Sequence, residues 1–479
     1  MTFARRIRWR DDSDRFALRD CGRTNQPRVR GETFQLRGTM KERYPIAIAR
    51  LRDMPDSTVK DLETSPKDPG TTTSMKQGAG PDVYFRKGFG LKAEVQAELS
   101  SDYNGRLVDL LRDREFCLES HGTTVRLARE FGFCYGVERA VDYAYQTRRK
   151  FPDRKVFLAG EIIHNPHVNT KLRDMGVEIL QIGPEGIDYS GVTAEDVVIL
   201  PAFGVTIKDF ETLRTIGCVM VDTTCGSVLN VWKRVESYAK GGFTSLIHGK
   251  YYHEETRATA SQATKYPGAH YFVVRNMDEA KVVCDFIEGR LTSTELMEKF
   301  SHAVSPEFDP ERDLKRIGVA NQTTMLARES LAIGVEVGKA MERANGEEYA
   351  KENFRTFDTI CSATQERQDA VIELLQQPID VMVVIGGYNS SNTISLAALC
   401  AEKVRTYHIE DAAAIDPVEN TIRYRPPGSK EDAIDTDWLS FDGPVQVGIT
   451  AGASTPNNKI GDAVARIFAT RGIAASDIA

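Results

Sequence analysis

The sequence contains no apolar run long enough to cross a lipid bilayer. Its longest runs include Val197–Leu200 and Val381–Ile385, whereas a membrane-spanning helix needs about 20 predominantly apolar residues. The start of the chain also lacks the basic-then-apolar pattern of a secretory signal peptide. We therefore expect a soluble protein that does not act at a membrane.

An excess of basic residues, which is typical of general nucleic-acid binders, is missing as well. The formal net charge is −7 over 479 residues. Residues 1–40 differ from the rest, with ten Arg, no Lys and five acidic residues. Organelle transit peptides are rich in Ser and poor in acids, whereas this segment has one Ser and carries Asp11, Asp12 and Asp14. We therefore favour a bacterial cytoplasm over a plastid stroma.

Residues 1–82 show little hydrophobic periodicity. The stretch Thr64–Pro81 is poor in apolar side chains, which is typical of linkers and disordered segments. We expect a disordered or poorly ordered N-terminal arm, or a true start at Met40 or Met75. From Val83 the apolar content rises, and Val95–Arg114 has the spacing of an amphipathic helix.

No pair of cysteines has the C-x-x-C spacing of zinc ribbons or thioredoxin-like sites. A long chain without a secretion signal favours reduced thiols over disulfides. By spacing alone, most of the cysteines are expected to be small buried hydrophobic residues. There are eight: Cys21, Cys117, Cys134, Cys218, Cys225, Cys284, Cys361 and Cys400.

Short apolar runs alternate with amphipathic segments from residue 123 onward. This alternation predicts an α/β fold with parallel sheets covered by helices. The expected strands are Val156–Leu158, Val197–Leu200, Val219–Val221, Ser245–Ile247, Tyr271–Val274, Ile317–Ala320, Val381–Ile385 and Val445–Ile449. The expected helices include Val137–Arg149, Val228–Ala239, Met325–Ala344 and Gln365–Leu375.

Three of the cysteines share one local pattern. Cys134, Cys225 and Cys361 each lie between a short predicted strand and a predicted helix. The carboxyl ends of parallel strands are where such proteins bind ligands, and a helix N-terminus is expected to lower the pKa of a thiol. Three converging thiolates suit an iron–sulfur cluster with one iron left open. The alternative is that cysteine merely tolerates tight strand–helix turns.

Two loops rich in small polar residues, Gly386–Thr393 and Ala451–Asn457, each follow a predicted strand. Such loops can bind a phosphate through backbone and hydroxyl donors, or simply cap the next helix. Other polar candidates follow strands in the same way, and each has a purely structural alternative. They are His164, His253, Glu255, Thr323 and Thr324, of which the histidines suit anion binding and the carboxyl group suits proton transfer.

Eight segments occur in one order along the chain: Phe131–Val141, Glu161–Asn165, Asp222–Cys225, His253–Glu255, Asn321–Thr324, Cys361–Gln368, Asn389–Asn392 and Ala451–Pro456. Taken together and in this order, they resemble the 4-hydroxy-3-methylbut-2-enyl diphosphate reductase family. The resemblance runs from about residue 83 to the end and is nearest to the cyanobacterial and plant-plastid branch.

The resemblance implies a trefoil of three α/β domains around a central 4Fe–4S cluster with three cysteine ligands and one open iron site. It implies that Cys134, Cys225 and Cys361 are those ligands, that Glu255 relays protons and that Thr324 is its hydroxyl partner. It further implies ferredoxin or flavodoxin, with its reductase, as electron donor. It implies a diphosphate-binding set of His164, His253, Ser390, Ser391, Asn392 and Ser454. Thr323, whose hydroxyl group could face a substrate, completes the substrate-binding residues that we expect.

The implied division of the chain is an extension at 83–122 and domains at 123–225, 226–356 and 357–479. One residue departs from the pattern of many bacterial members, since Phe203 stands where they carry a histidine that touches the diphosphate. Two readings outside this family remain open. One is a hydrolase or transferase that uses one cysteine with His253 as base, and the other is a cluster-bearing sensor or scaffold without catalytic activity.

Overall fold

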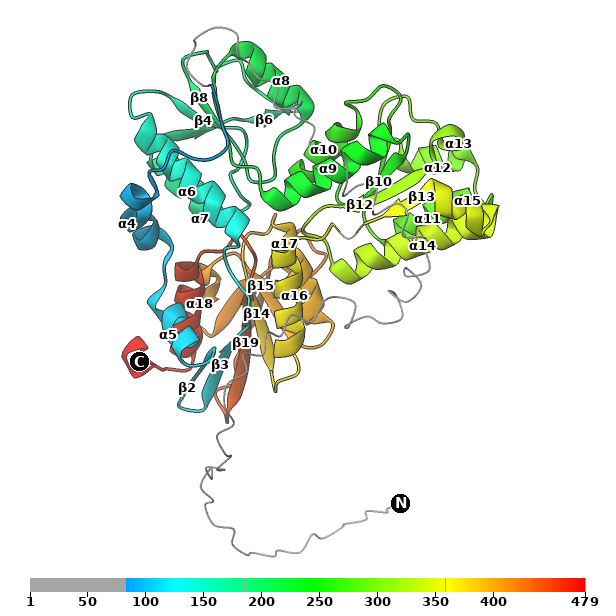
Figure 1. Cartoon of the computed structure of the whole chain (residues 1–479). Coiled ribbons are helices and arrows are strands. Elements are labelled where there is room, and N and C mark those ends of the chain that lie inside the picture. The colour runs from blue at the N-terminus through cyan, green and yellow to red at the C-terminus, as the bar shows by residue number, and fades with distance from the viewer. Residues whose placement is uncertain (1–82, 184–185, 358, 479) are drawn as a thin grey trace, which may run out of the picture. The chain divides into compact units, whose positions relative to one another are not determined.

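The computed structural model describes residues 83–183, 186–357 and 359–478 (Figure 1). All of them belong to one compact unit, Lys76–Ala479. The three largest of its sheets are each accompanied by their own helices, so the predicted α/β fold with small parallel sheets is confirmed. No helix within these ranges is long and apolar enough to span a membrane. The predicted N-terminal arm, residues 1–82, lies outside the described residues.

The first sheet is fully parallel and has the order β1-β9-β8-β4-β5. Its core is apolar because α6 and α7 bury valine, alanine and leucine side chains against the strands. We call this part of the molecule the first lobe. Its strands are β1 (Tyr84–Phe85), β4 (Val156–Leu158), β5 (Val177–Ile179), β8 (Val197–Leu200) and β9 (Val219–Asp222), and its helices are α6 (Tyr135–Lys150), α7 (Pro166–Asp174) and α8 (Ile207–Ile216).

The second sheet is also fully parallel, in the order β11-β10-β12-β13. Its strands and the helices that contact them form the second lobe. The strands are β10 (Thr244–His248), β11 (Tyr271–Val274), β12 (Ile317–Asn321) and β13 (Phe354–Thr356). The main helices are α9 (Gly226–Lys240), α10 (Glu254–Ala263), α11 (Met277–Ile287) and α14 (Ala327–Asn345), and α12 (Ser293–Phe300), α13 (Pro310–Asp313) and α15 (Glu347–Asn353) are shorter.

The third sheet has the order β15-β14-β19-β3-β2 and is parallel except for the β2–β3 pair. It forms the third lobe. Its strands are β2 (Cys117–Ser120), β3 (Thr123–Leu127), β14 (Val381–Ile385), β15 (Arg405–Ile409) and β19 (Val445–Ala451), and its helices are α5 (Arg106–Asp113), α16 (Ser362–Leu374), α17 (Ser391–Ala401) and α18 (Asn457–Thr470).

The strand β3 corrects one predicted boundary. The sequence places residues 123–127 at the start of the first domain, but they pair with β19 in the third sheet. This strand alternates polar and apolar side chains, with Val125 and Leu127 in the core of the third lobe. A pairing between segments more than 300 residues apart leaves no local signal in such a short strand.

A second correction concerns the helix predicted over Val95–Arg114. The structure contains two helices, α4 (Lys92–Tyr103) and α5, separated at Asn104 and Gly105. A Cβ at Gly105 would lie 2.6 Å from the carbonyl oxygen of Asn457, so the chain approaches the start of α18 closely here. The continuous apolar spacing serves two cores, because Val95 packs in the first lobe and Leu111 in the third.

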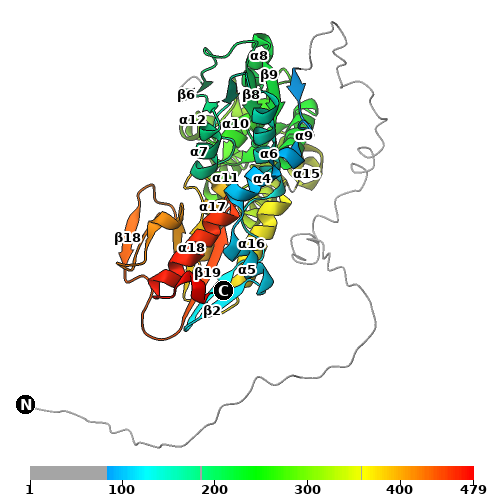
Figure 2. The same cartoon turned by 90° about the vertical axis from the view of Figure 1, so that its left-hand side faces the viewer.

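A three-stranded antiparallel sheet is attached to the third lobe next to α18 (Figure 2). It consists of β16 (Ile415–Asp416), β17 (Thr421–Tyr424) and β18 (Ala433–Thr436). A two-stranded ribbon, β6 (Ile182–Gly183) and β7 (Gly186–Ile187), belongs to the first lobe.

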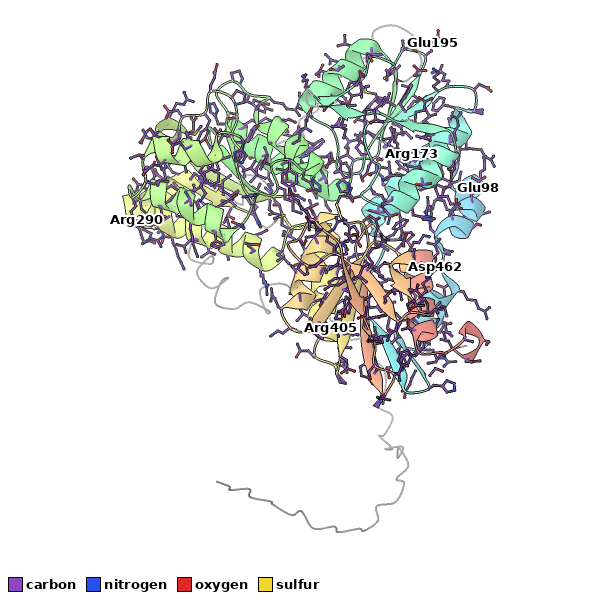
Figure 3. All side chains as sticks on the ribbon, turned by 180° about the vertical axis from the view of Figure 1, so that it is seen from behind. Glu98, Arg173, Glu195, Arg290, Arg405 and Asp462 are labelled. Atoms are coloured by element: carbon purple, nitrogen blue, oxygen red, sulfur yellow. The ribbon has the colours of Figure 1, made fainter. Side chains whose placement is uncertain are left out.

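The carboxyl ends of the strands point toward the place where the three lobes meet. Figure 3 shows Glu195, just before β8, at the outer end of the first lobe, so the amino end of β8 faces outward. The segments that follow β8, β9, β10, β12, β14 and β19 all reach one cavity. Parallel sheets commonly bind ligands at this edge, and here three such edges share one site.

Candidate active site

Three cysteines occupy equivalent positions at the starts of three helices. Cys134 immediately precedes α6, Cys225 precedes α9 and Cys361 precedes α16. Each has the extended backbone conformation of an N-cap residue. None of their side chains makes a capping hydrogen bond. The predicted strand–cysteine–helix order is therefore present three times, and each cysteine lies between a strand of one lobe and a helix of another.

Two of these sulfurs lie beside Gly136, where the absence of a side chain leaves room for them. A Cβ added at Gly136 would lie 2.4 Å from Cys225 Sγ and 3.9 Å from Cys134 Sγ. Any side chain here would collide with the Cys225 thiol. The third cysteine, Cys361, lines the same cavity as these two.

Cys134 and Cys225 do not have the lowered pKa that a helix N-terminus was expected to give. Burial is the largest influence on these two thiols, and it raises the pKa of both. Backbone N–H groups at the helix starts, Val137 for Cys134 and Ser227 for Cys225, act in the opposite direction but are outweighed. The helix starts alone therefore do not favour the thiolate form of these two cysteines.

A buried arginine fixes the loop before Cys134. The guanidinium of Arg367 donates hydrogen bonds to the carbonyl oxygens of Gly132, at 2.7 Å, and Phe133, at 3.2 Å. Its charge also lowers the pKa of the Cys134 thiol, although burial of that thiol has the larger, opposite effect. Arg367 therefore links α16, which begins after Cys361, to the loop that carries Cys134.

The three cysteines line a cavity of about 700 Å³, a volume that includes its opening to solvent. All three lobes contribute to it. Every site residue predicted from the sequence lines this cavity: Cys134, Cys225, Cys361, Glu255, Thr324, His164, His253, Thr323, Ser390, Ser391, Asn392 and Ser454.

Glu255 is the buried acid of the cavity. Its side chain is 3% exposed, and Oε1 accepts a hydrogen bond of 2.6 Å from the backbone N–H of Thr323. Burial raises its pKa from 4.5 to about 7, against the opposing effects of the Thr323 hydrogen bonds and the His164 charge. A carboxyl group with this pKa holds its proton about half of the time at neutral pH, as a general acid requires.

The predicted partnership between Glu255 and the Thr324 hydroxyl takes a different form. The hydrogen bond to Glu255 comes from Thr323, while Thr324 Oγ1 accepts from Gln322 Nε2 at 2.7 Å. Because Gln322 supplies the donor, the hydroxyl hydrogen of Thr324 is free to point into the cavity. The two threonines therefore lie side by side with separate hydrogen-bond partners.

His253 presents an unpaired nitrogen to the cavity. Its Nδ1 accepts a hydrogen bond of 3.1 Å from the backbone N–H of Glu255. Burial, followed by the charge of His164, lowers its pKa to about 3, so the ring is neutral and its proton is on Nε2. This Nε2 is buried without a hydrogen-bond partner in the described part of the chain. It can donate to an anionic ligand.

His164 is a charged residue held between two carboxylates. Its Nδ1 lies 3.0 Å from Glu161 Oε2 and its Nε2 lies 3.4 Å from Glu254 Oε2. Burial lowers its pKa, but the two carboxylates outweigh this effect and raise it to about 9. The ring of Phe203 stacks on His164 with a centroid distance of 4.7 Å. The apolar residue at position 203 thus covers the imidazolium.

Three side chains that could ligate a metal ion already interact with neighbouring groups. His164, His253 and Glu254 place their ligand atoms within 4.8 Å of each other. The ion pair between His164 and Glu254 and the capping hydrogen bond of His253 account for that closeness.

A row of small polar groups forms another wall of the cavity, at the start of α17 and in the loop before α18. Ser390 is the N-cap residue and accepts a hydrogen bond from Thr393 N. Asn392 Oδ1 accepts from Ala453 N at 2.9 Å, and Ser454 Oγ donates to the carbonyl oxygen of His164 at 3.2 Å. The first N–H groups of a helix have no partner within the helix and attract anions. This wall can therefore bind a phosphate group.

Some residues at the cavity were not identified from the sequence. Thr364 and Ser227 line it, and Lys250 donates a hydrogen bond from Nζ to Ser391 Oγ at 3.1 Å. Glu161 and Glu254 hold His164. The two glutamates and Thr364 lie within recognised segments, so proximity to the predicted residues was the available signal. Lys250 lies in the segment His248–Thr256, three residues before His253, but the sequence predicted no role for it.

The chain is similar to known proteins that share one name. The chain is 46% identical over 393 residues to the 4-hydroxy-3-methylbut-2-enyl diphosphate reductase of Cyanothece sp., which covers 81% of this chain and 94% of that protein. It is 46% identical over 392 residues to the enzyme of the same name from Thermosynechococcus vestitus, covering 82% and 96%.

A solved structure shares the fold. The E-1-hydroxy-2-methyl-but-2-enyl-4-diphosphate reductase from Plasmodium falciparum superposes with a TM-score of 0.52 at 20% identity, over 71% of this chain and 86% of that one. Residues 125–468 match the LytB protein family. This match spans most of the chain and includes all the cysteines of the cavity, and the chain belongs to the LytB family.

Proposed function

We propose that this chain reduces 4-hydroxy-3-methylbut-2-enyl diphosphate to isopentenyl diphosphate and dimethylallyl diphosphate, the last step of the methylerythritol phosphate (non-mevalonate) pathway. The observation that carries the proposal is the single cavity in which three thiols, a buried acid and an anion-binding wall meet. The relatives with which the chain shares nearly half of its residues bear the name of this reductase.

The residues present fit an iron–sulfur cluster held by Cys134, Cys225 and Cys361. The thiols come from three separate helix starts, and Gly136 leaves free the space that a Cβ would fill. Three cysteine ligands leave one iron of a 4Fe–4S cluster open. When bound, such a cluster supplies electrons and an open Lewis-acid position, and its positive irons stabilise the thiolates.

Binding of the diphosphate is assigned to the phosphate-binding wall at the start of α17 and to His164 and His253. Ser390, Ser391, Asn392 and Ser454 present small donors, and His253 presents its unpaired Nε2–H. Interactions with a group remote from the reacting carbon fix the position of the allylic alcohol, which lowers the entropic part of the barrier.

Proton delivery is assigned to Glu255, with Thr323 and Thr324 beside it. Removal of the hydroxyl group consumes two electrons and two protons: one proton leaves in water with the hydroxyl oxygen, and the other adds to an allylic carbon. Glu255, with a pKa of about 7, holds a proton about half of the time at neutral pH. The free hydroxyl hydrogen of Thr324 can orient the substrate oxygen for that transfer.

The electrons come from a small redox protein in this proposal. We assign ferredoxin or flavodoxin, with its reductase, as the donor, since the reaction consumes reducing equivalents that no amino-acid side chain supplies. The bacterial cytoplasm is the proposed compartment, with a plastid stroma as the alternative.

The experiment is an anaerobic turnover assay with a chemically reduced one-electron donor and 4-hydroxy-3-methylbut-2-enyl diphosphate, with both products separated and quantified. We expect both diphosphate products from the parent protein and none from Cys361→Ser. Release of inorganic phosphate or of the free alcohol in air, without iron, would instead support the cysteine–histidine hydrolase.

A further inference from the structure

The cavity has little free positive charge for an anionic ligand. None of the described residues that line it is Lys or Arg. His164 is protonated, but Glu161 and Glu254 balance its charge. His253 is neutral, and Phe203 contributes an apolar ring. A diphosphate therefore meets dipoles and hydroxyl groups but no unpaired cation among the lining residues.

Lys250 lies beside this lining, next to Ser391. Its ammonium group donates a hydrogen bond of 3.1 Å to Ser391 Oγ, and Ser391 is a cavity residue in the first turn of α17. The backbone is fixed on both sides: Lys250 N donates to Gln322 Oε1 at 3.1 Å, and Lys250 O accepts from His253 N at 2.9 Å. The lysine thus joins the second lobe to the phosphate-binding wall of the third.

Within the described part of the chain, this ammonium has no acidic partner. Among residues 83–183, 186–357 and 359–478, no carboxylate oxygen forms an ion pair with Lys250, and Ser391 Oγ is the acceptor of its side chain. Its side chain is half-buried, and burial lowers its pKa. A partly desolvated cation without a carboxylate is costly unless a ligand supplies the negative charge.

We propose that Lys250 is a diphosphate-binding residue that acts together with Ser391, an inference that rests on the proposed function of this cavity. The ammonium donates one hydrogen to Ser391 Oγ, so the serine hydroxyl hydrogen is free to donate to a phosphate oxygen. The remaining ammonium hydrogens are available to the same phosphate, since Lys has three donors. This arrangement provides a cation on the second-lobe side, while position 203 remains apolar.

The test compares the anaerobically purified holoenzyme with two variants and a control. Lys250→Met removes the positive charge and retains the length and the apolar stem of the side chain. Lys250→Arg keeps a positive charge at this position. Lys281→Met, at an exposed lysine on α11 whose ammonium is 4.0 Å from Asp278, is the matched control. The measurements are calorimetric affinity for isopentenyl diphosphate at two salt concentrations, affinity for the uncharged alcohol isopentenol, KM and kcat, and iron content.

We expect Lys250→Met to weaken isopentenyl diphosphate binding by about tenfold to a hundredfold, the range for loss of one charge-assisted hydrogen bond. KM should rise by a similar factor and the salt dependence of binding should fall. Iron content and isopentenol affinity should stay at parental values, and Lys250→Arg should recover much of the affinity.

Two outcomes overturn the inference. In the first outcome, Lys250→Met binds isopentenyl diphosphate as tightly as the parent and as Lys281→Met, and the parent turns over substrate. The role of Lys250 is then wrong and the proposed function stands. If the parent itself binds neither iron nor isopentenyl diphosphate, the proposed function is wrong and this inference is wrong with it.

Discussion

Replacement of Glu255 with glutamine tests the proposed proton transfer. Glutamine keeps the size of the side chain and an oxygen that can accept from Thr323 N–H, but it has no acidic proton. General acid catalysis contributes about 10²–10⁴-fold to a rate. We therefore expect Glu255→Gln to lower kcat by at least about a hundredfold, with iron content and substrate KM unchanged.

The same variant has a predicted effect on stability. Burial raises the pKa of Glu255 from 4.5 in the unfolded chain to about 7 in the fold. Because the folded state binds this proton more tightly, the associated stability is fully present below pH 4.5 and is lost as the pH rises through 7. A shift from 4.5 to about 7, or about 2.5 pKa units, corresponds to about 3 kcal/mol. Glutamine does not ionise, so Glu255→Gln should be more stable than the parent at pH 8 by up to about 3 kcal/mol.

The assay measures kcat against pH, and urea unfolding at pH 5 and pH 8, all without oxygen. The parent rate should fall as the pH rises above about 7, where Glu255 loses its proton, and the stability advantage of the variant should shrink toward pH 5. Glu298→Gln, at an exposed position on α12, is the control and should match the parent in both measurements. Normal turnover by Glu255→Gln would refute the proton-donor role, and an equal stability difference at the two pH values would refute the raised pKa.

Two further substitutions test the cluster site and the phosphate-binding wall. Gly136→Ala places a methyl group 2.4 Å from the present position of Cys225 Sγ, so iron content should fall strongly even though alanine favours a helix by about 0.5–1 kcal/mol. The helical control Gly461→Ala, with its nearest contact at 3.6 Å, should retain its iron. Full iron in Gly136→Ala would contradict the proposed position of the cluster. Asn392→Asp keeps the acceptor for Ala453 N but adds a negative charge to the phosphate-binding wall. The KM of the diphosphate substrate should therefore rise by about a hundredfold or more. An unchanged KM would show that the diphosphate does not bind at this wall.

The strands and the cysteine positions were predictable because their signals are local. Val197–Leu200 and Val381–Ile385 are short apolar runs bounded by polar turns, and both are strands with these bounds. The helix break at Gly105 was not predictable, because the apolar spacing continues across it while facing two different cores. The pairing of β3 with β19 is equally non-local.

At the site, residue types were predictable and their electrostatics were not. Glu255 was identified as a proton donor from its neighbours in the sequence, and its burial supports that role. The cysteine pKa values depend on burial among segments from three lobes, and that burial outweighs the local helix effect. Lys250 became visible only when the fold placed its ammonium at Ser391.

The central claim, that three thiols from three lobes hold one cluster, is tested most directly by counting iron and acid-labile sulfide per chain. The protein would be purified without oxygen, as parent and with Cys134, Cys225 or Cys361 each changed to Ser. Cys117→Ser, a half-buried cysteine on β2 outside the cavity lining, is the control. We predict about four irons and four sulfides per chain in the parent and the control, with loss or marked lability in each of the three cavity variants. A folded parent that stays free of iron after anaerobic reconstitution, or a cavity variant with its full and stable complement, would contradict the claim.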